Sequence, residues 1–252
     1  MVEGQMDGAE RFFSLVIELL TRLRDSQGPA ISAAADAIAR SLRAGGLVHL
    51  FGTGHSHMLA EEVFYRAGGL IPVDAMLDPA VLLSTGAQRS TVAERTPGLA
   101  AAIAARYELR SSDVGIVISN SGRNAGPVEM AVLMKARGLT VIALTSRAHS
   151  AAVNPAPPNS PRLFEVADIV LDNGGAYGDA SLQLPGVAHP VGPTSTIAGA
   201  ALLHAVFIGA MERLVAAGET VINLPSGNVE GANIIDVAAE LNRYRDRIRH
   251  WE

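Results

Sequence analysis

Three short runs of glycine and hydroxyl residues have the composition of an anion site. They are GTGHSH at residues 52–57, SNSG at 119–122 and TST at 194–196. Glycine lets a chain turn sharply and exposes backbone N–H groups, while serine and threonine add hydroxyl donors. A phosphate group accepts several such hydrogen bonds at once. Each run alone is also typical of a helix cap, but together they predict a site for a phosphate-like group.

The residues assigned to this binding site come from the three runs and from the end of a further apolar run, TVIALT. They are Gly52, Thr53, Gly54, His55, Ser56, His57, Ser119, Asn120, Ser121, Gly122, Thr145, Thr194, Ser195 and Thr196. The two histidines of the first run form a His-x-His pair. Metal binding needs further ligands, and no third one is evident, so no metal and no cofactor are expected.

Three titratable residues near these runs could transfer protons: Glu61, Glu62 and His204. A carboxylate and an imidazole are common general acid–base groups. Each also has a structural interpretation. Glu62 has the helical spacing for an ion pair with Arg66, and Glu61 has it for a pair with His57. His204 lies in the apolar stretch ALLHAVF, where a hydrogen-bonded core histidine is the commoner occurrence.

Composition excludes several classes of chemistry. The chain has no cysteine, which removes disulfides, thiolate metal sites and a cysteine nucleophile. Its single lysine, Lys135, is the only candidate for Schiff-base chemistry. The net charge is −5 without a basic run, so no nucleic-acid partner is expected. The N-terminal residues lack the pattern of a secretory signal, and the apolar stretch 197–211 is short for a membrane span. We therefore expect a cytoplasmic protein without a membrane partner.

Short apolar runs that alternate with helical patterns indicate the fold. Runs at 47–52, 70–73, 113–119, 140–145 and 167–171 are typical of buried strands. Their alternation with helices predicts right-handed βαβ units. We expect an α/β fold, a parallel sheet with helices on both faces. In such sheets, ligands bind outside the carboxyl ends of the strands, where GTGHSH and SNSG lie.

The 252 residues are expected to form one domain, 1–252, with a core over about 35–225. Apolar periodicity predicts a first helix over 9–24 and a second over 31–42. A helix over 57–67 follows the first run, a long apolar helix spans 195–216, and a helical tail spans 232–252. The stretches 78–96 and 172–194 have the Gly, Pro and polar composition of loops.

One alternative for the first run is a dinucleotide fingerprint. Gly52-x-Gly54 begins that pattern, and Asp74, about twenty residues on, matches its ribose-binding acid. His57 occupies the place of the third glycine, where a Cβ opposes close helix–strand packing. NAD binding is therefore the less favoured interpretation.

The combined motifs resemble the SIS (sugar isomerase) domain. GTGHSHMLAEEVFYRAGGL, DNGGAYGD and GPTSTIAGA are most similar to a phosphoheptose-isomerase-like group within it, over about residues 10–235. The resemblance implies a flavodoxin-like three-layer αβα sandwich around a five-stranded parallel sheet. It also implies a phosphosugar ligand and homodimers or homotetramers with sites at subunit boundaries. Phosphate contacts are implied from Ser56, Ser119, Ser121 and Thr196, with Thr194 or Ser195 as further candidates. Polar side chains after the last strand are candidates for contacts to sugar hydroxyls, with ordinary Asx turns as the alternative; they are Asp172, Asn173 and Asp179.

For catalysis, the resemblance implies a glutamate on the first site helix and a histidine on the late helix. Arg66 occupies the position of that glutamate, and Glu61 and Glu62 lie one turn earlier. His204 falls near the position of the histidine. Three hypotheses follow: an aldose–ketose isomerase of a sugar phosphate, a lyase or etherase on the same fold, and a non-catalytic phosphosugar-binding module.

Overall fold

The computed structural model describes residues 7–229 and 234–251. Two helices open it, α1 (Gly8–Ser26) and α2 (Gly28–Arg43). Asp7 begins α1 with a reciprocal cap: its carboxylate accepts from the Glu10 backbone N–H at 2.8 Å, and Glu10 accepts from the Asp7 N–H at 3.2 Å. Compared with the predicted helix over 9–24, α1 begins one residue earlier and ends two residues later.

The central sheet has five parallel strands in the order β2-β1-β3-β4-β5. They are β1 (Val48–Gly52), β2 (Val73–Ala75), β3 (Val114–Ile118), β4 (Thr140–Thr145) and β5 (Ile169–Asp172). All side chains of β1, β2 and β3 are buried, as expected for a sheet covered on both faces.

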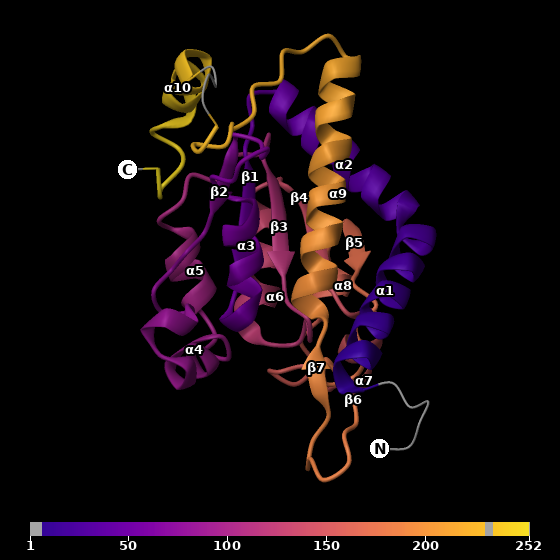
Figure 1. Cartoon of the computed structure of the whole chain (residues 1–252). Coiled ribbons are helices and arrows are strands. Elements are labelled where there is room, and N and C mark those ends of the chain that lie inside the picture. The colour runs from indigo at the N-terminus through magenta and orange to yellow at the C-terminus, as the bar shows by residue number, and fades with distance from the viewer. Residues whose placement is uncertain (1–6, 230–233, 252) are drawn as a thin grey trace.

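Helices cover both faces of the sheet, which confirms the predicted three-layer αβα sandwich (Figure 1). On one face α1, α2, α3 (His57–Val63) and α9 (Ser195–Ala216) bury a cluster that includes Ile38, Leu203 and Phe207. On the other face α5 (Leu99–Ala104), α6 (Ala125–Ala136) and α8 (Leu163–Val166) pack over Phe51 and Met130. Helices α4 (Ala87–Ala93) and α7 (Arg147–Ala152) lie between these elements in the chain.

Some predicted boundaries are wrong for identifiable reasons. The second strand begins at Val73 rather than Leu70, because Leu70 bridges Asn223 and Pro72 has no N–H to donate. The helix predicted over 57–67 ends at Val63, because Phe64 turns extended and packs into the core. The strand predicted at 167–171 lies at 169–172.

Two segments predicted as loops contain regular structure. The stretch 78–96 includes α4, which begins after Gly86 and is mostly exposed. The stretch 172–194 includes a small antiparallel pair, β6 (Ala180–Leu182) and β7 (Val191–Pro193). Both segments are too short or too exposed to show an apolar period in the sequence.

The C-terminal region packs at the amino ends of the strands. Helix α10 (Ile234–Tyr244) is followed by turns. The tail was predicted to be helical over 232–252, but only part of it is helical. Residues 1–6, 230–233 and 252 of the predicted single domain lie outside the described residues. Val237, Tyr244 and Ile248 bury a third apolar cluster against Leu47 and Ile71.

A buried charged cluster joins this tail to the sheet. His49 Nδ1 lies 2.9 Å from Asp74 and its Nε2 lies 3.2 Å from Asp113. Arg247 Nη2 donates to Asp113 at 2.7 Å. Burial opposes the charged imidazole, but hydrogen bonds to Asp113 and Asp74 outweigh it and raise the pKa of His49. Burial also opposes the Asp113 carboxylate, and bonds from His49, Arg110 and Leu47 outweigh it and lower its pKa.

Candidate functional site

The polar runs meet at the carboxyl ends of the strands. Gly52 at the end of β1 is in register with Ile118 at the end of β3, so GTGHSH and SNSG begin at the same edge. Helix α9 starts at this end as well (Figure 1). A crevice of about 130 Å³ opens between them, lined by His55, Ser56, Leu59, Ile118, Asn120, Leu144, Asn173, Asp179, Ser195 and Thr196.

Five of the predicted binding residues line this crevice: His55, Ser56, Asn120, Ser195 and Thr196. The others lie close to lining residues in the chain but do not line the crevice themselves. These are Gly52, Thr53, Gly54, His57, Ser119, Ser121, Gly122, Thr145 and Thr194. The three predicted proton-transfer residues, Glu61, Glu62 and His204, also lie outside its lining.

Several hydroxyls at this edge remain available to a ligand. Within the described part of the chain, the side chains of Ser56, Ser121 and Thr196 have no hydrogen-bond partner. Ser119 Oγ accepts from the Gly122 N–H at 3.1 Å, which leaves its own hydroxyl proton free to donate. The Thr145 hydroxyl donates to the Asn120 carbonyl oxygen at 3.2 Å instead. The three free hydroxyls are therefore the donors best placed for an anion.

Asn173, a candidate for contacts to sugar hydroxyls, lines the crevice. Its amide Nδ2 donates to Asn120 Oδ1 at 2.9 Å, and its Oδ1 accepts from the Gly175 N–H at 2.9 Å. The side chain is almost fully buried, with 3% exposed. The pairing leaves the amide nitrogen of Asn120 as a donor toward the crevice. The signal in the sequence was the polar run DNGG after the fifth strand, but that run does not indicate that Asn120 is the hydrogen-bond partner of Asn173.

Asp179, the other candidate for sugar contacts that lines the crevice, already binds the start of α9. Its Oδ1 accepts from the backbone N–H groups of Thr194 and Ser195 at 3.1 and 2.9 Å. Its Oδ2 accepts from the Ser195 hydroxyl at 2.6 Å. The first amides of a helix attract anions, and here a carboxylate of the chain itself fills that position. Thr194 and Ser195 therefore have fewer donors to offer a ligand than Thr196.

Glu62 and His204 lie side by side on neighbouring helices. His204 Nε2 is 3.0 Å from Glu62 Oε1, and Arg66 donates to Glu62 Oε2 at 3.2 Å. The expected Glu62–Arg66 pair is thus present together with the contact to His204. The His204 side chain is 43% exposed, so it is not a core histidine. A hydrogen-bonded carboxylate and imidazole are chemically able to exchange protons with a ligand.

The Glu61–His57 pair also forms, with His57 Nε2 3.7 Å from Glu61 Oε1. The other ring nitrogen of His57 contacts the Gly54 carbonyl oxygen. His57 is buried, whereas Glu61 points outward with 48% of its side chain exposed. These contacts give His57 and Glu61 a structural role in shaping the first run.

His149 adds a titratable group close to the crevice wall. Its Nδ1 accepts from the Gly178 N–H at 3.1 Å, and its ring lies 5.3 Å from that of Tyr177. Burial lowers the pKa of His149; Asp179 opposes this effect and Arg123 adds to it. The lowered pKa favours the neutral imidazole, whose Nδ1 can accept the Gly178 N–H, whereas a protonated Nδ1 could not.

Other features carry less chemistry. Among the described residues, no group of three or more potential ligand side chains is arranged for a metal ion. Lys135 pairs with Asp168 at 2.6 Å, which gives it a structural partner. Helix α9 is long and apolar enough by length and composition to cross a membrane, but it packs on α2 and α3 as a helix of the sandwich.

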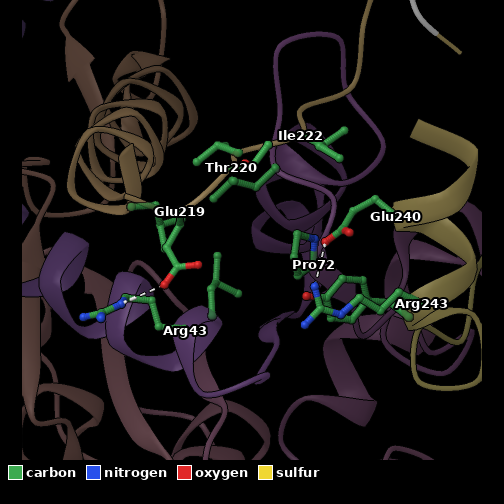
Figure 2. A pocket seen from close by; sticks show the side chains of 12 residues that line it. Arg43, Pro72, Glu219, Thr220, Ile222, Glu240 and Arg243 are labelled. Carbon is green, nitrogen blue, oxygen red and sulfur yellow. Dashed lines mark hydrogen bonds and ion pairs between the residues drawn. The ribbon is translucent and has the colours of Figure 1, made fainter. Parts of the chain in front are cut away.

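A second cavity, of about 110 Å³, lies at the opposite end of the sheet (Figure 2). Its rim carries two ion pairs, Arg43–Glu219 at 3.2 Å and Arg243–Glu240 at 3.7 Å. Pro72 and Ile222 contribute apolar surface. Because its charges are paired with each other, this cavity is a weaker candidate for an anion than the crevice with free hydroxyls.

Sequence comparison agrees with this architecture. A family model described as SIS domain matches residues 11–146. A UPF0309 protein of Brucella ovis is 44% identical over 241 residues, which are 96% of this chain and 98% of that protein. A UPF0309 protein of Brucella canis matches with the same identity and coverage. The chain therefore belongs to the SIS domain family, and the resemblance inferred from its motifs is confirmed.

Solved structures share the fold. A phosphoheptose isomerase from Francisella tularensis aligns with a TM-score of 0.56 and 20% identity, covering 82% of this chain and 100% of that one. The phosphoheptose isomerase GmhA from Neisseria gonorrhoeae aligns with a TM-score of 0.51 and 20% identity, covering 81% and 97%. At this identity the likeness concerns the fold.

Proposed function

We propose that this protein binds a sugar phosphate in the crevice at the carboxyl ends of the strands. The observation that carries the proposal is the set of unpartnered hydroxyls of Ser56 and Thr196 in one crevice with Asn120. Ser119 and Ser121 lie on either side of Asn120 in the run after β3, and they add two further hydroxyls to the donor set. Membership of the SIS domain family supports a phosphosugar over other anions. Neutral donors suffice, because hydrogen bonds to a charged phosphate are among the stronger ones.

The favoured activity is an aldose–ketose isomerisation at the Glu62–His204 pair. Glu62 lies on α3, less than one turn after the crevice residue Leu59, so a sugar that extends from the crevice along α3 reaches it. The carboxylate would remove the C2 proton of the open-chain aldose and return a proton to C1. His204 would move the hydroxyl proton between O1 and O2. The same bases would serve a lyase, which breaks a C–O bond instead.

A second candidate is a phosphosugar-binding module without catalysis. The observation that favours it is the engagement of both Glu62 oxygens, one by His204 and one by Arg66. With both oxygens engaged, the carboxylate has fewer free lone pairs with which to take up a substrate proton. In this case the crevice binds its ligand, and the pair on α3 and α9 is structural.

We also infer that the protein forms a homodimer or a larger homo-oligomer through α1. Phe13 and Ile17 are one helical turn apart on α1, and their side chains are 67% and 63% exposed. Two large apolar side chains on one helix face are typical of a surface that another chain covers. The absence of a nucleic-acid or membrane partner remains a prediction, and so does the cytoplasmic location.

The experiment is a ligand screen followed by an exchange measurement. A panel of aldose and ketose phosphates is tested for thermal stabilisation, with the unphosphorylated sugars as controls. A ligand at 100 times its Kd stabilises the fold by about 2.7 kcal/mol. Bound sugars are then incubated in D₂O, and label is measured at C2 of aldoses and at C1 of ketoses. Stabilisation with exchange supports an isomerase, and stabilisation without exchange supports the binding module. Equal stabilisation by unphosphorylated sugars contradicts the proposed phosphate site.

A further inference from the structure

One carboxylate connects two of the polar runs. Glu94, the residue that follows α4, accepts a hydrogen bond from the Thr53 hydroxyl at its Oε2, at 2.9 Å. Its Oε1 accepts from the Asn124 side-chain amide, also at 2.9 Å. Thr53 belongs to GTGHSH, and Asn124 lies two residues after SNSG. Glu94 therefore bridges the loop after β1 and the loop after β3.

Backbone contacts anchor this bridge at both sides. The Gly126 N–H donates to the Glu94 carbonyl oxygen at 2.8 Å, which ties α4 to the start of α6. A Cβ on Gly126 would lie 3.1 Å from that oxygen, so the approach is close. The Gly54 N–H donates to the Val81 carbonyl oxygen at 3.0 Å, and Ser90 Oγ donates to the same oxygen at 2.6 Å. The segment 81–94 thus holds both loops independently of the crevice.

The bridge has no direct part in the crevice. Thr53, Glu94 and Asn124 do not line it, and the two donors are nearly buried, with 5% and 7% of their surface exposed. Helix α4 lies at the end of the sheet toward which the strands run (Figure 1). Glu94 can therefore influence a ligand only through the placement of the two loops.

We infer that Glu94 is a positioning residue that sets the spacing between the loop carrying Ser56 and the loop carrying Ser119–Ser121. This inference rests on the proposed phosphosugar site. A phosphate group is small, and it is bound tightly only when donors from both loops reach it together. Loss of the bridge lets the loops separate, so each donor set binds without the other.

Two substitutions separate this role from general destabilisation. Glu94→Ala removes both hydrogen bonds. Glu94→Gln preserves both, because its oxygen accepts from Asn124 and its amide nitrogen donates to the Thr53 hydroxyl, which also accepts. Glu129→Ala is the matched control. Glu129 also holds a loop through a carboxylate, accepting from the Gly98 N–H at 2.8 Å, but it contacts neither polar run.

The test combines amide hydrogen exchange with titration of inorganic phosphate and fructose 6-phosphate. In Glu94→Ala, we expect faster exchange in both 52–57 and 119–124 and an affinity about tenfold lower or weaker still. Glu94→Gln and Glu129→Ala should remain within about threefold of the wild type. If Glu94→Ala does not fold, Thr53→Val removes one of the two bonds and should speed exchange in the first loop.

The outcomes are distinguishable. Unchanged exchange in Glu94→Ala, or a change in one loop alone, overturns the inference. Equal affinity of Glu94→Ala and wild type overturns it as well, as does failure of Glu94→Gln to restore the wild-type behaviour. A wild type that binds neither probe contradicts the proposed function instead, while the exchange rates still show whether Glu94 couples the loops.

Discussion

Replacing Ser56 by alanine should weaken ligand binding without weakening the fold. The Ser56 hydroxyl lines the crevice and has no hydrogen-bond partner within the described residues. Its removal therefore leaves no group of the protein unsatisfied. A hydrogen bond to a charged group contributes about 1.5–3 kcal/mol. Because about 1.4 kcal/mol corresponds to a factor of ten, the affinity for a sugar phosphate should fall about 10- to 150-fold.

Ser195 provides a matched comparison on the opposite wall of the same crevice. Its hydroxyl donates to Asp179 at 2.6 Å, so Ser195→Ala removes a bond to a charged group of the protein itself. We expect this variant to lose about 1.5–3 kcal/mol of unfolding free energy. Its loss of affinity should be smaller than that of Ser56→Ala. The two serines thus test whether the hydrogen bonds within the chain predict which hydroxyl is available.

The assay is calorimetric titration with the sugar phosphate that stabilises the wild type most, together with urea unfolding of each variant. Ser56→Ala should show the wild-type urea midpoint and a raised Kd. The reasoning is refuted if Ser56→Ala binds as tightly as wild type, or if Ser195→Ala loses affinity with unchanged stability. Thr196→Val is a further replacement of a free hydroxyl and should behave like Ser56→Ala.

Three more predictions concern catalysis, the buried cluster and assembly. If the protein isomerises its ligand, Glu62→Gln should lower turnover about 10²- to 10⁴-fold with Kd nearly unchanged, measured by C2 exchange in D₂O; undiminished exchange removes Glu62 as the base. His49→Gln should lower the unfolding free energy at pH 6 by about 3–5 kcal/mol, because it breaks a buried ion pair. The folded-state pKa of His49 is raised above 6.5, so the stability that the charged imidazole adds is complete below pH 6.5. It is lost as the pH rises through the folded-state pKa. A plot of urea midpoint against pH should therefore be flatter for the variant than for the wild type. Phe13→Asp should shift the sedimentation profile of an oligomer toward the monomer, and a wild type that is already monomeric at micromolar concentrations contradicts the interface on α1.

The elements that the sequence predicts best are those whose pattern is local. Strand β4 (Thr140–Thr145) and helix α9 (Ser195–Ala216) were predicted to the residue. In β4, a continuous apolar run follows a glycine turn and ends at hydroxyls. In α9, a hydroxyl run leads directly into an apolar helix. The parallel direction of the strands follows from the strand–helix alternation, because parallel strands need a crossover, whereas the strand order comes from the structure.

The parts that could not be predicted depend on distant partners. Glu94 lies in a polar stretch with no apolar period, and its two contacts are 41 and 30 residues away. Asp179 reaches the start of α9 from a left-handed backbone, φ 69°, and its two backbone partners are 15 and 16 residues away. The pattern of residues indicated that the polar runs meet. Which of their hydroxyls are already hydrogen-bonded depends on partners that come close only in the folded chain.

The ion pair between Asp113 and Arg247 joins the middle of the sheet to a residue that is synthesised much later. Asp113 precedes β3, the middle strand, and its guanidinium partner follows 134 positions later. While the chain emerges from a ribosome, the three central strands are complete long before that arginine is available. During this interval Asp113 can still accept from His49 and from the backbone N–H groups of Leu47 and Arg110, but it lacks its guanidinium partner. A chain shortened before Arg247 should therefore form the sheet with this buried carboxylate incompletely paired, which a lowered urea midpoint would show.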